Sequence, residues 1–329
     1  MKPENKLVVV SERTLNFLKL TGLLSPYYLI RRIFYKLTNR KLKSLVFSKI
    51  YKKSFRNEEK IPEDYESYYD HIEKGIKKMR NSKVVLCGCV RDEEEIIGTT
   101  VSRLEETGKM FKDYRIVIFE SDSKDKTLAI LKKRVKKNKR IILLNNRKNY
   151  PRLKNQGETR MKIMAYCRNK YLEYIQEKFF DLDYMMVFDL DYYGGWNNGG
   201  IANTFGHENW DVMGANGLCY GDYHDSYPLR IKNFEDRCYM GGRQKELNKK
   251  QIKENNIKWI KAKQPKLKPG EDLFPIVSCF SGLAIYKMKA IKNCKYGFED
   301  CEHVSFHKQI HKRGFKRFFI NPSMIIILE

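Results

Sequence analysis

Residues 83–95 are KVVLCGCVRDEEE, a nearly continuous apolar run rich in valine that ends abruptly in charged residues. Three further runs of this kind follow, at residues 114–120 (YRIVIFE), 140–145 (RIILLN) and 184–191 (YMMVFDLD). Segments with the pattern of helices separate them, at residues 91–107, 121–137 and about 156–180. Apolar strands that alternate with helices predict an α/β fold, with a mostly parallel sheet and helices on both of its faces.

The remainder of the chain adds an appendage at each side of this pattern. Residues 1–80 are basic and apolar by turns, so we expect a basic, largely helical N-terminal arm (1–80) before the main domain (81–329). A polar, lysine-rich insertion at about residues 233–269 predicts a surface loop or lid. Two more strands, a helix and a last strand are expected at residues 210–217, 278–287, 301–314 and 315–321.

The composition is that of a folded protein that works beside anions. The chain has 329 residues, 42% of them hydrophobic and 13% aromatic, enough for one large domain with an appendage. With 65 Lys and Arg against 40 Asp and Glu, the net charge is +25. This charge favours polyanionic partners such as nucleic acid, anionic lipid or phosphorylated small molecules, although a compositionally biased genome would give the same lysine excess.

Cysteine usage and hydropathy predict a cytoplasmic location. The eight cysteines show no CxxC spacing and several lie in apolar runs, which is typical of buried free thiols in a reducing compartment. No signal peptide opens the chain, and no apolar run reaches the roughly 18 residues of a membrane span. The basic, apolar residues 15–51 suit the surface of an anionic membrane, and the alternative is a helix packed on the main domain.

Asp189 and Asp191 follow the fourth apolar run directly, within VFDLDYYGGW. In sheets of this kind ligands bind beyond the carboxyl ends of the strands. Side chains two residues apart on an extended segment point the same way, and two carboxylates on one face suit Mg²⁺ or Mn²⁺. Such an ion keeps open positions for phosphate oxygens and neutralises a diphosphate leaving group. The alternative is an acidic turn without a ligand.

Arg168 lies in the middle of the inward stripe of the third predicted helix. The residues of this stripe follow helical spacing: Met161, Ala165, Arg168, Leu172, Ile175 and Phe179. An arginine in such a place is almost never unpaired. Either it forms a structural ion pair with an aspartate, or Arg168 and Asn169 orient the carboxylates or the diphosphate, with Arg160 near the same face. Both interpretations place Arg168 beside the metal site.

These segments together resemble the GT-A glycosyltransferases in order and spacing. KVVLCGCVRDEEE, IVIFESDSKDKT, GETRMKIMAYCRN and VFDLD come first, and SCFSGLAIYK and CEHVSFHKQIHKRGF are similar to the acceptor-side strand and last helix of that fold. GETR…AYCRN, HDSYPLR and the last two segments look most like the capsule-associated, cryptococcal-type mannosyltransferases and their viral and bacterial relatives. The resemblance covers roughly residues 83–323. It implies a Mn²⁺- or Mg²⁺-dependent enzyme of glycan synthesis that passes a sugar from a UDP- or GDP-linked donor to a hydroxyl acceptor.

The resemblance also implies roles for individual residues. Asp189 and Asp191 would bind the metal, with Asp191 the more direct ligand, and Asp225 would lie near the donor or acceptor sugar. The nucleotide would be bordered by residues after the first two strands, by the third helix and by the centre of the D-x-D: Val90, Arg91, Glu93, Glu120, Asp122, Arg160, Arg168, Asn169 and Leu190.

The chain departs from the resembled family at the start of the last helix. Many inverting relatives carry Glu-Asp there, eleven residues before a glycine, and the Asp is the catalytic base. Counting back from Gly314, this chain has Glu302 and His303. Either could deprotonate an acceptor hydroxyl, and His303 could instead complete the metal shell. A retaining enzyme needs no such base, so the stereochemistry stays open. A zinc site of His303, His307 and His311, which share a helix face, is a further alternative.

Two other functions compete with glycosyl transfer. A nucleotidyltransferase shares the open sheet and the metal-diphosphate chemistry, but such enzymes usually carry a glycine-rich, basic loop where this chain has CVRDEEE. A non-catalytic protein that binds nucleic acid or membrane, built on a degenerate transferase, is the other alternative. Residues 131–149, with nine Lys and Arg and no acid, are either a solvated helix face or a basic collar for an anionic acceptor or membrane. The D-x-D and the inward Arg168 favour the transferase, for which no nucleic acid partner is expected.

Overall fold

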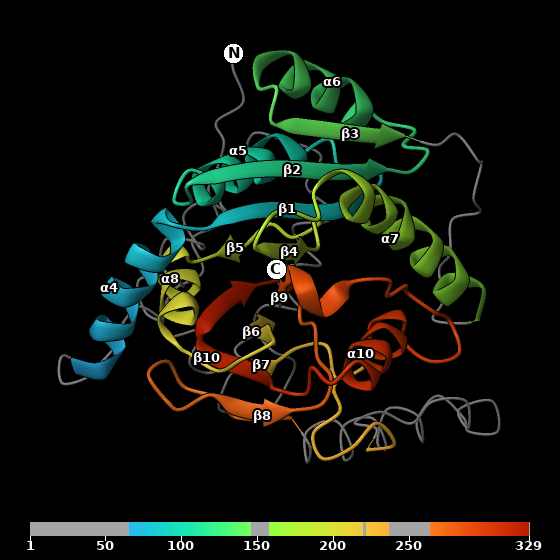
Figure 1. Ribbon diagram of the computed structural model, residues 1–329. Helices are drawn as coiled ribbons and strands as arrows, with labels where there is room; N and C mark the ends of the chain where they lie inside the picture. Colours follow the sequence, from blue (N-terminus) through green and yellow to red (C-terminus); the bar gives the residue numbers. More distant parts are fainter. Residues whose placement is uncertain (1–65, 146–157, 220–221, 237–263, 329) are drawn as a thin grey trace, which may run out of the picture. The chain divides into compact units, whose positions relative to one another are not determined.

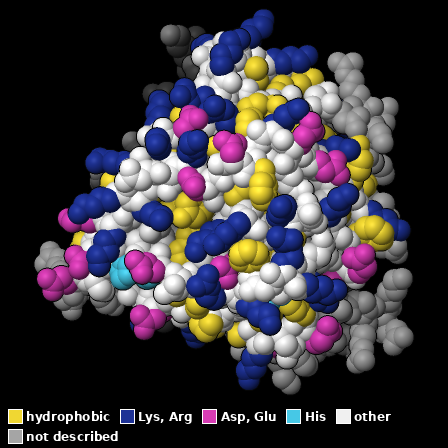
Figure 2. Space-filling view, in the orientation of Figure 1, with side chains coloured by type: hydrophobic (Ala, Val, Ile, Leu, Met, Phe, Trp, Pro, Cys, Tyr) yellow, Lys and Arg dark blue, Asp and Glu magenta, His cyan; other side chains and the backbone are white. Residues whose placement is uncertain are grey.

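The computed structural model describes residues 66–145, 158–219, 222–236 and 264–328 (Figure 1), all within one compact unit that spans Ile61–Glu329. The predicted membrane-surface segment, the end of the basic run and most of the lysine-rich insertion lie outside these residues. The predicted division between residues 80 and 81 therefore stays a prediction. No helix in the described part of the chain is both long enough and apolar enough to cross a bilayer. Figure 2 shows Lys and Arg side chains spread over the face in view, with Asp and Glu among them.

The described residues form one ten-stranded sheet. Its main path runs β3 (Ile141–Asn145), β2 (Asp113–Glu120), β1 (Lys83–Val90), β4 (Tyr184–Phe188), β9 (Leu283–Lys287), β6 (Val212–Cys219), β10 (Phe318–Ile327) and β5 (Gly195–Trp196). Two short strands pair beside it, β7 (Asp222–Tyr223) with β6 and β8 (Phe274–Ile276) with β10.

The predicted parallel order holds for the first half of the sheet, where β1 pairs with β2 and β4, and β2 with β3, all in parallel. Figure 1 shows β3, β2 and β1 side by side in this order. The second half is mixed. The strand predicted in SCFSGLAIYK is β9, and it runs antiparallel between β4 and β6, whereas β6 and β10 pair in parallel.

Helices cover both faces of the sheet. They are α4 (Glu66–Arg80), α5 (Ile97–Gly108), α6 (Thr127–Lys137), α7 (Glu158–Lys178), α8 (Asn198–Gly206) and α10 (Glu302–Lys312), with a 3₁₀ turn at Met288–Ile291. Alternate residues of β1 point into two separate cores. Val85 and Cys87 pack with α7 and α10, whereas Val84 and Leu86 pack with α4, α5, α6 and α8. The α/β fold with helices on both faces is confirmed.

The end of the predicted N-terminal arm packs closely on the main domain. A Cβ atom added to Gly75 of α4 would lie 1.7 Å from the carbonyl oxygen of Ala202 in α8, so only glycine permits this approach. At the other end of the contact the rings of His71 and His207 stack with centroids 3.9 Å apart. Helix α4 is thereby fixed to the outer face of α8.

Sheet order brings the expected site residues to one edge. Because β1, β2 and β4 are parallel, their carboxyl ends meet there, and the antiparallel β9 begins at the same edge. The amide of Asp189 donates to the carbonyl of Gly282 at 2.9 Å and joins the ends of β4 and β9. In β1, a Cβ on Gly88 would lie 2.4 Å from the Phe188 carbonyl oxygen, so glycine permits the turn after β4.

Candidate active site

Arg168 of α7 joins two carboxylates from different parts of the chain. Its guanidinium Nη2 donates to Asp189 Oδ1 at 2.9 Å, and its Nε donates to Glu302 Oε1 at 3.1 Å. The side chain is only 3% exposed, and its guanidinium carbon lies 4.9 Å from the centre of the Phe280 ring. The inward position of Arg168 and its pairing with an aspartate are confirmed. Arg168 also links the end of β4 to the start of α10.

The two aspartates of the D-x-D are in different surroundings. Strand β4 ends at Phe188, so the pair lies on the bend that follows the strand, where the charges of Asp189 and Asp191 act on each other. A shared face for the two carboxylates stays a prediction. Both carboxylate oxygens of Asp189 are bonded, Oδ1 to Arg168 and Oδ2 to the Tyr192 hydroxyl at 3.0 Å. Asp191 is exposed and has no ion-pair partner among the described residues. Asp189 is therefore positioned by the protein, and Asp191 is open to a ligand.

Negative charge accumulates around this bend. The surrounding protein and the charge of Asp189 raise the pKa of Asp191 to about 6. Burial and the charge of Asp191 raise the pKa of Glu93 to about 8, and burial with the charges of Asp189 and Glu302 raises that of Asp225 to about 7. Desolvation is the larger cause of each of these shifts, and the charge of a neighbouring carboxylate adds to it. The added charge shows that several carboxylates lie close together at this bend, where a cation would be stabilised.

The donors at this bend suit a hard divalent ion. Asp191 and Asp189 offer only oxygen atoms, the ligands that Mg²⁺ and Mn²⁺ prefer. Within the ranges that the structure describes, no group of three His, Cys, Asp or Glu side chains could hold a metal ion. An ion bound by the aspartates would complete its shell with water or substrate oxygens, the usual habit of Mg²⁺.

The histidines of α10 do not join this site. His307 is fully buried, and its two ring nitrogens contact the Ser278 hydroxyl at 2.8 Å and the Tyr286 hydroxyl at 2.9 Å. His303 stacks on Phe280 with ring centroids 3.8 Å apart, and burial lowers its pKa well below the usual range. The three-histidine zinc site and a metal-binding role for His303 are therefore both wrong for the described residues.

Glu302 and Asp225, two of the predicted catalytic residues, lie near Arg168 and Asp189. Glu302 is 6% exposed and is held by Arg168, with its second oxygen 3.6 Å from the Cys301 thiol. Asp225 is half-buried, and its Oδ2 accepts a hydrogen bond from the Ser281 amide at 3.3 Å. The structure thus brings Glu302, Asp225 and Asp189 together around one buried arginine.

Some of the residues predicted to border the nucleotide lie at the open edge. Asp122 has a left-handed backbone (φ 53°), and its Oδ2 is buried without a hydrogen-bond partner, as expected of an acceptor for a ligand hydroxyl. Arg91 is half-buried with its Nε 3.8 Å from Asp92. Arg160 is exposed, and its positive charge partly opposes the rise in the pKa of Asp191. Val90 is buried and accepts from the Ser121 amide at 3.1 Å.

Three other residues of that set are buried or make hydrogen bonds within the fold. Glu120 is fully buried and accepts from the Ser123 amide at 2.6 Å and from the Asn145 side chain. Asn169 exchanges two hydrogen bonds with the backbone of Tyr296, at 2.8 and 2.9 Å. Leu190 is fully buried beside Gly88. The predicted contacts of Glu120, Asn169 and Leu190 with a nucleotide stay predictions.

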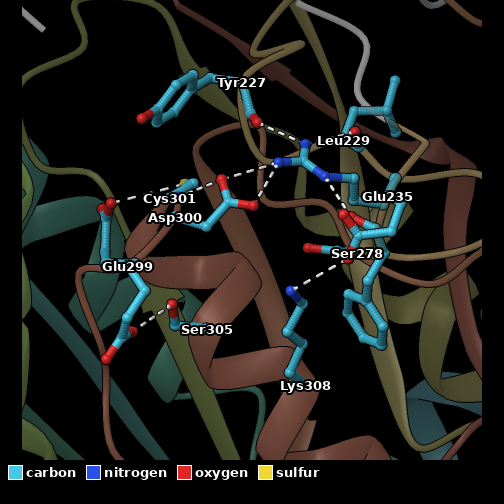
Figure 3. Close-up of polar contacts among 12 residues, drawn as sticks. Tyr227, Leu229, Glu235, Ser278, Glu299, Asp300, Cys301, Ser305 and Lys308 are labelled. Carbon is cyan, nitrogen blue, oxygen red and sulfur yellow. Dashed lines mark hydrogen bonds and ion pairs between the residues drawn. The ribbon is translucent and has the colours of Figure 1, made fainter. Parts of the chain in front are cut away.

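Arg230 is a structural residue that the sequence did not reveal. It is fully buried, and Nη2 bonds both carboxylate oxygens of Asp300, at 2.9 and 3.1 Å. Nη1 donates to the carbonyls of Tyr227 and Leu229, each at 2.9 Å, and Nε to that of Phe234 at 3.1 Å. Figure 3 shows Asp300 facing this guanidinium at the start of α10. Arg230 occupies an irregular segment, where no hydrophobic period marks an inward position.

Comparison with known families agrees with this architecture. Residues 85–176, from β1 into α7, match the family described as Glycosyl transferase family 2. The match covers less than a third of the chain and ends before Asp189. It supports the GT-A resemblance, whereas the relation to capsule-associated mannosyltransferases stays a prediction. None of the curated proteins compared with this chain matches it.

Several solved structures are similar to this chain at low identity. TarS 1–349 from S. aureus has a TM-score of 0.41 at 12% identity over 74% of this chain, which spans 60% of that one. The mannosyltransferase PcManGT from Pyrobaculum calidifontis, in complex with GDP-Man and Mn²⁺, has a TM-score of 0.42 at 11% identity. The match covers 88% of this chain and 68% of that one. Glucosyl-3-phosphoglycerate synthase from Mycobacterium tuberculosis, in complex with Mn²⁺, UDP and phosphoglyceric acid, has a TM-score of 0.39 at 10% identity. The match covers 78% of this chain and 72% of that one. Since these TM-scores lie below 0.5, no site residue is transferred from them.

Proposed function

We propose that the chain is a GT-A-type glycosyltransferase that moves a sugar from a UDP- or GDP-linked donor to a hydroxyl acceptor, in the synthesis of a glycan. The observation that carries this proposal is the acid pair at the end of β4. Asp189 is fixed by Arg168 and Tyr192, and Asp191 stands exposed beside it. The family match over residues 85–176 supports the same class of reaction.

The acid pair would hold Mn²⁺ or Mg²⁺, with Asp191 as the direct ligand. When bound, such an ion stabilises the negative charge of the departing nucleoside diphosphate. Arg168 keeps Asp189 in place and contributes a positive charge at the same point. Arg160 is near enough to Asp191 for its positive charge to oppose the rise in the pKa of that carboxyl, and it would add to the attraction for phosphate.

The donor nucleotide would lie across the ends of β1 and β2. Asp122 offers a buried, unpartnered carboxylate oxygen to a ribose or base donor. Glu93 and Arg91 lie on the loop after β1, and Glu93 is close enough to Asp191 for their charges to interact. Acceptor-side roles fall to the predicted catalytic residues Glu302, His303 and Asp225.

The loop after β1 disfavours a nucleotidyltransferase. Instead of a flexible, glycine-rich phosphate loop, its carboxylates are bonded to the loop after β2. Asp92 Oδ1 accepts from the Lys124 amide at 2.6 Å, and Glu94 Oε2 accepts from the Lys126 amide at 2.9 Å. With these oxygens bonded and the remaining charge negative, the loop does not resemble a phosphate cradle.

A thermal-shift panel of UDP- and GDP-sugars, with and without Mn²⁺, tests the proposal directly. A ligand that binds only the native state raises the unfolding midpoint, so at least one donor should do so in a Mn²⁺-dependent way. Asp191→Ala should abolish that dependence and the transfer reaction while the protein stays folded. Asp181→Ala changes an exposed aspartate before the opposite end of β4 and is the matched control. Unchanged turnover in Asp191→Ala would end the assignment.

A further inference from the structure

We propose that Asp225 is the base that takes the proton from the acceptor hydroxyl, which makes the enzyme inverting. The inference rests on the proposed glycosyl transfer and narrows its three catalytic candidates to one. It follows from what the other two side chains are bonded to, from the way Asp225 is held, and from the buried arginine that fixes its segment.

Glu302 and His303 are not placed to take a substrate proton. One oxygen of Glu302 accepts from Arg168 and the other faces the Cys301 thiol, and the side chain is 6% exposed. His303 is 2% exposed and lies flat against Phe280. A general base must reach the proton that it removes, directly or through one water. Asp225, half-buried, is the most accessible of the three.

The carboxylate of Asp225 is held by two backbone turns that meet. Asp225 and Ser281 both have left-handed backbones, with φ angles of 63° and 53°. The Ser281 amide donates to Asp225 Oδ2 at 3.3 Å, and the Ser281 hydroxyl donates to the His224 carbonyl at 3.0 Å. Backbones of this kind cost energy and persist where the surroundings enforce them, often at functional sites. Within the described residues Oδ1 of Asp225 makes no hydrogen bond and is left to receive a proton.

Electrostatics support this role independently of the backbone. Burial raises the pKa of Asp225, and the nearby charges of Asp189 and Glu302 add to this, so that the pKa rises to about 7. A base works best when its pKa lies near the working pH, because it is then both deprotonated and able to hold the proton. Asp225 is also near Tyr192, the hydroxyl that orients Asp189. The group therefore lies beside the donor end of the site.

Arg230 acts as the positioning residue for Asp225. Its guanidinium ties the segment after Asp225 to Asp300, at the start of α10. Its backbone pairs with that of Ser278, through amide-to-carbonyl bonds of 2.8 and 3.1 Å, three residues before Ser281. Arg230 thus connects the segment after Asp225 to the start of α10 through its side chain, and to the segment before Ser281 through its backbone.

The reaction step balances without a further reactant. The acceptor oxygen forms a bond to the anomeric carbon of the sugar as its proton moves to Asp225. The bond from that carbon to the diphosphate oxygen breaks, and its electron pair leaves with the nucleoside diphosphate. Attack opposite the leaving group inverts the anomeric centre.

The test compares Asp225→Asn with Glu302→Gln, using UDP-glucose, UDP-GlcNAc and GDP-mannose with Mn²⁺. Hydrolysis of the donor measures transfer to water, and added sodium azide measures transfer to a nucleophile that carries no proton. Asp225→Asn should slow hydrolysis by about 10²- to 10⁴-fold, the usual contribution of a base. Donor affinity and the unfolding midpoint should stay unchanged. Azide should restore transfer in Asp225→Asn, and the glycosyl azide should have inverted configuration by NMR.

Each alternative result is decisive. Hydrolysis by Asp225→Asn at the wild-type rate, failure of azide to restore transfer, or a retained configuration would overturn the role of Asp225. A greater loss in Glu302→Gln that azide restores would assign the base to Glu302. Wild-type protein that binds and turns over none of the donors would instead overturn glycosyl transfer itself, and the base with it.

Discussion

Two buried arginines, Arg168 and Arg230, show how this fold separates structure from chemistry. All three nitrogens of Arg230 are bonded, and its carboxylate partner Asp300 is buried. Arg168 pairs with Asp189, which is 23% exposed, and its own Nη1 is buried without a hydrogen-bond partner. A buried polar group left unsatisfied in a native protein calls for an explanation, often a catalytic role or an unseen ligand. The complete network holds loops together, and the incomplete one borders the proposed reaction.

The same contrast separates two histidines one turn apart on α10. Both ring nitrogens of His307 contact hydroxyl groups, whereas neither ring nitrogen of His303 has a partner. His303 packs against the Phe280 ring that also contacts Arg168. Among the histidines of α10, His303 is the one whose unsatisfied ring nitrogens lie beside the Arg168 network, whereas His307 is satisfied within the core.

Arg230→Met is expected to have the largest effect on stability. It leaves Asp300 buried without its counter-charge and frees three carbonyls, a change that typically costs about 3–5 kcal/mol. Urea unfolding followed by circular dichroism measures the loss. The double variant Arg230→Met/Asp300→Leu should recover part of it, because replacing both members of a buried pair is often neutral. A loss below about 1 kcal/mol in the single variant would show that the Arg230 network is not structural.

Arg168→Met should change chemistry more than stability. Asp189 can take up water in place of Arg168, but Glu302 is left buried without its counter-charge, so the cost should be about 3 kcal/mol, at the lower end of the range for a broken buried pair. Removing a positive charge beside the acid pair should tighten Mn²⁺ binding by roughly tenfold, about 1–2 kcal/mol of relieved repulsion, while turnover falls. Titration calorimetry measures the affinity for Mn²⁺, and the rate of donor hydrolysis measures the fall in turnover.

Arg168→Lys keeps the charge and is the control for this experiment. It should bind Mn²⁺ like the wild type while losing the fork that holds two carboxylates. If Arg168→Met destabilises the protein as much as Arg230→Met and leaves Mn²⁺ binding unaltered, the distinction between the two networks fails.

Much of the fold and part of the site could be predicted from the sequence. The apolar runs of β1, β2 and β4 are buried on both faces, so their pattern is unmistakable, and the spacing around Arg168 gave its inward position. The antiparallel direction of β9 follows from chain connectivity, which local pattern does not encode. Strands of two or three residues, such as β5 and β8, are too short to show a period.

Side-chain partners were harder to predict than positions. Asp189 and Asp191 are alike in sequence, and only the bend after β4 separates a bonded carboxylate from an exposed one. Glu302 and His303 were expected at the last helix, but burial against Arg168 and Phe280 is a tertiary property. Glu299 and Asp300 form a Glu-Asp pair just before that helix, but both carboxylate oxygens of Asp300 are bonded to Arg230. The dipeptide by itself does not indicate that its aspartate forms a buried ion pair.

Two histidines, the buried His307 and the half-buried His207, should each contribute a loss of stability in acid. The raised pKa values of Glu93 and Asp225 contribute in the opposite direction, so the histidine contribution is measured by comparing variants. Burial lowers the pKa of His307 to about 3 and that of His207 to about 4, below the usual value of 6.5. The unfolded chain then binds more protons below pH 6.5, so stability is fully present above that pH and falls as the pH drops towards the folded values. Between pH 7 and 5.5 the loss from His307 should be about 1 kcal/mol. The contribution of His207 should be smaller, because this side chain is partly exposed and solvent screens its charge.

Urea unfolding at several pH values measures this slope, and His307→Gln is the informative variant. His307→Gln should remove the contribution of this histidine to the change of unfolding free energy with pH. It should also lower stability at neutral pH, because it disturbs the contacts with Ser278 and Tyr286. A slope that is the same in both proteins would show that His307 does not stay neutral in the folded chain.

Tyr192→Phe is the mildest change and tests the incomplete network most finely. The Tyr192 hydroxyl donates to Asp189 Oδ2, at the half-exposed end of the site, so its loss should cost no more than about 1 kcal/mol of stability. Asp189 keeps Arg168 but gains rotational freedom at its second oxygen. Turnover should fall several-fold with little change in donor affinity, because orientation at the reacting centre, rather than binding, is disturbed. Tyr193→Phe, whose exposed hydroxyl bonds Glu95 instead, is the matched control. Equal effects from the two substitutions would mean that Asp189 needs only its arginine, and that the carboxylate is less precisely held than its two bonds indicate.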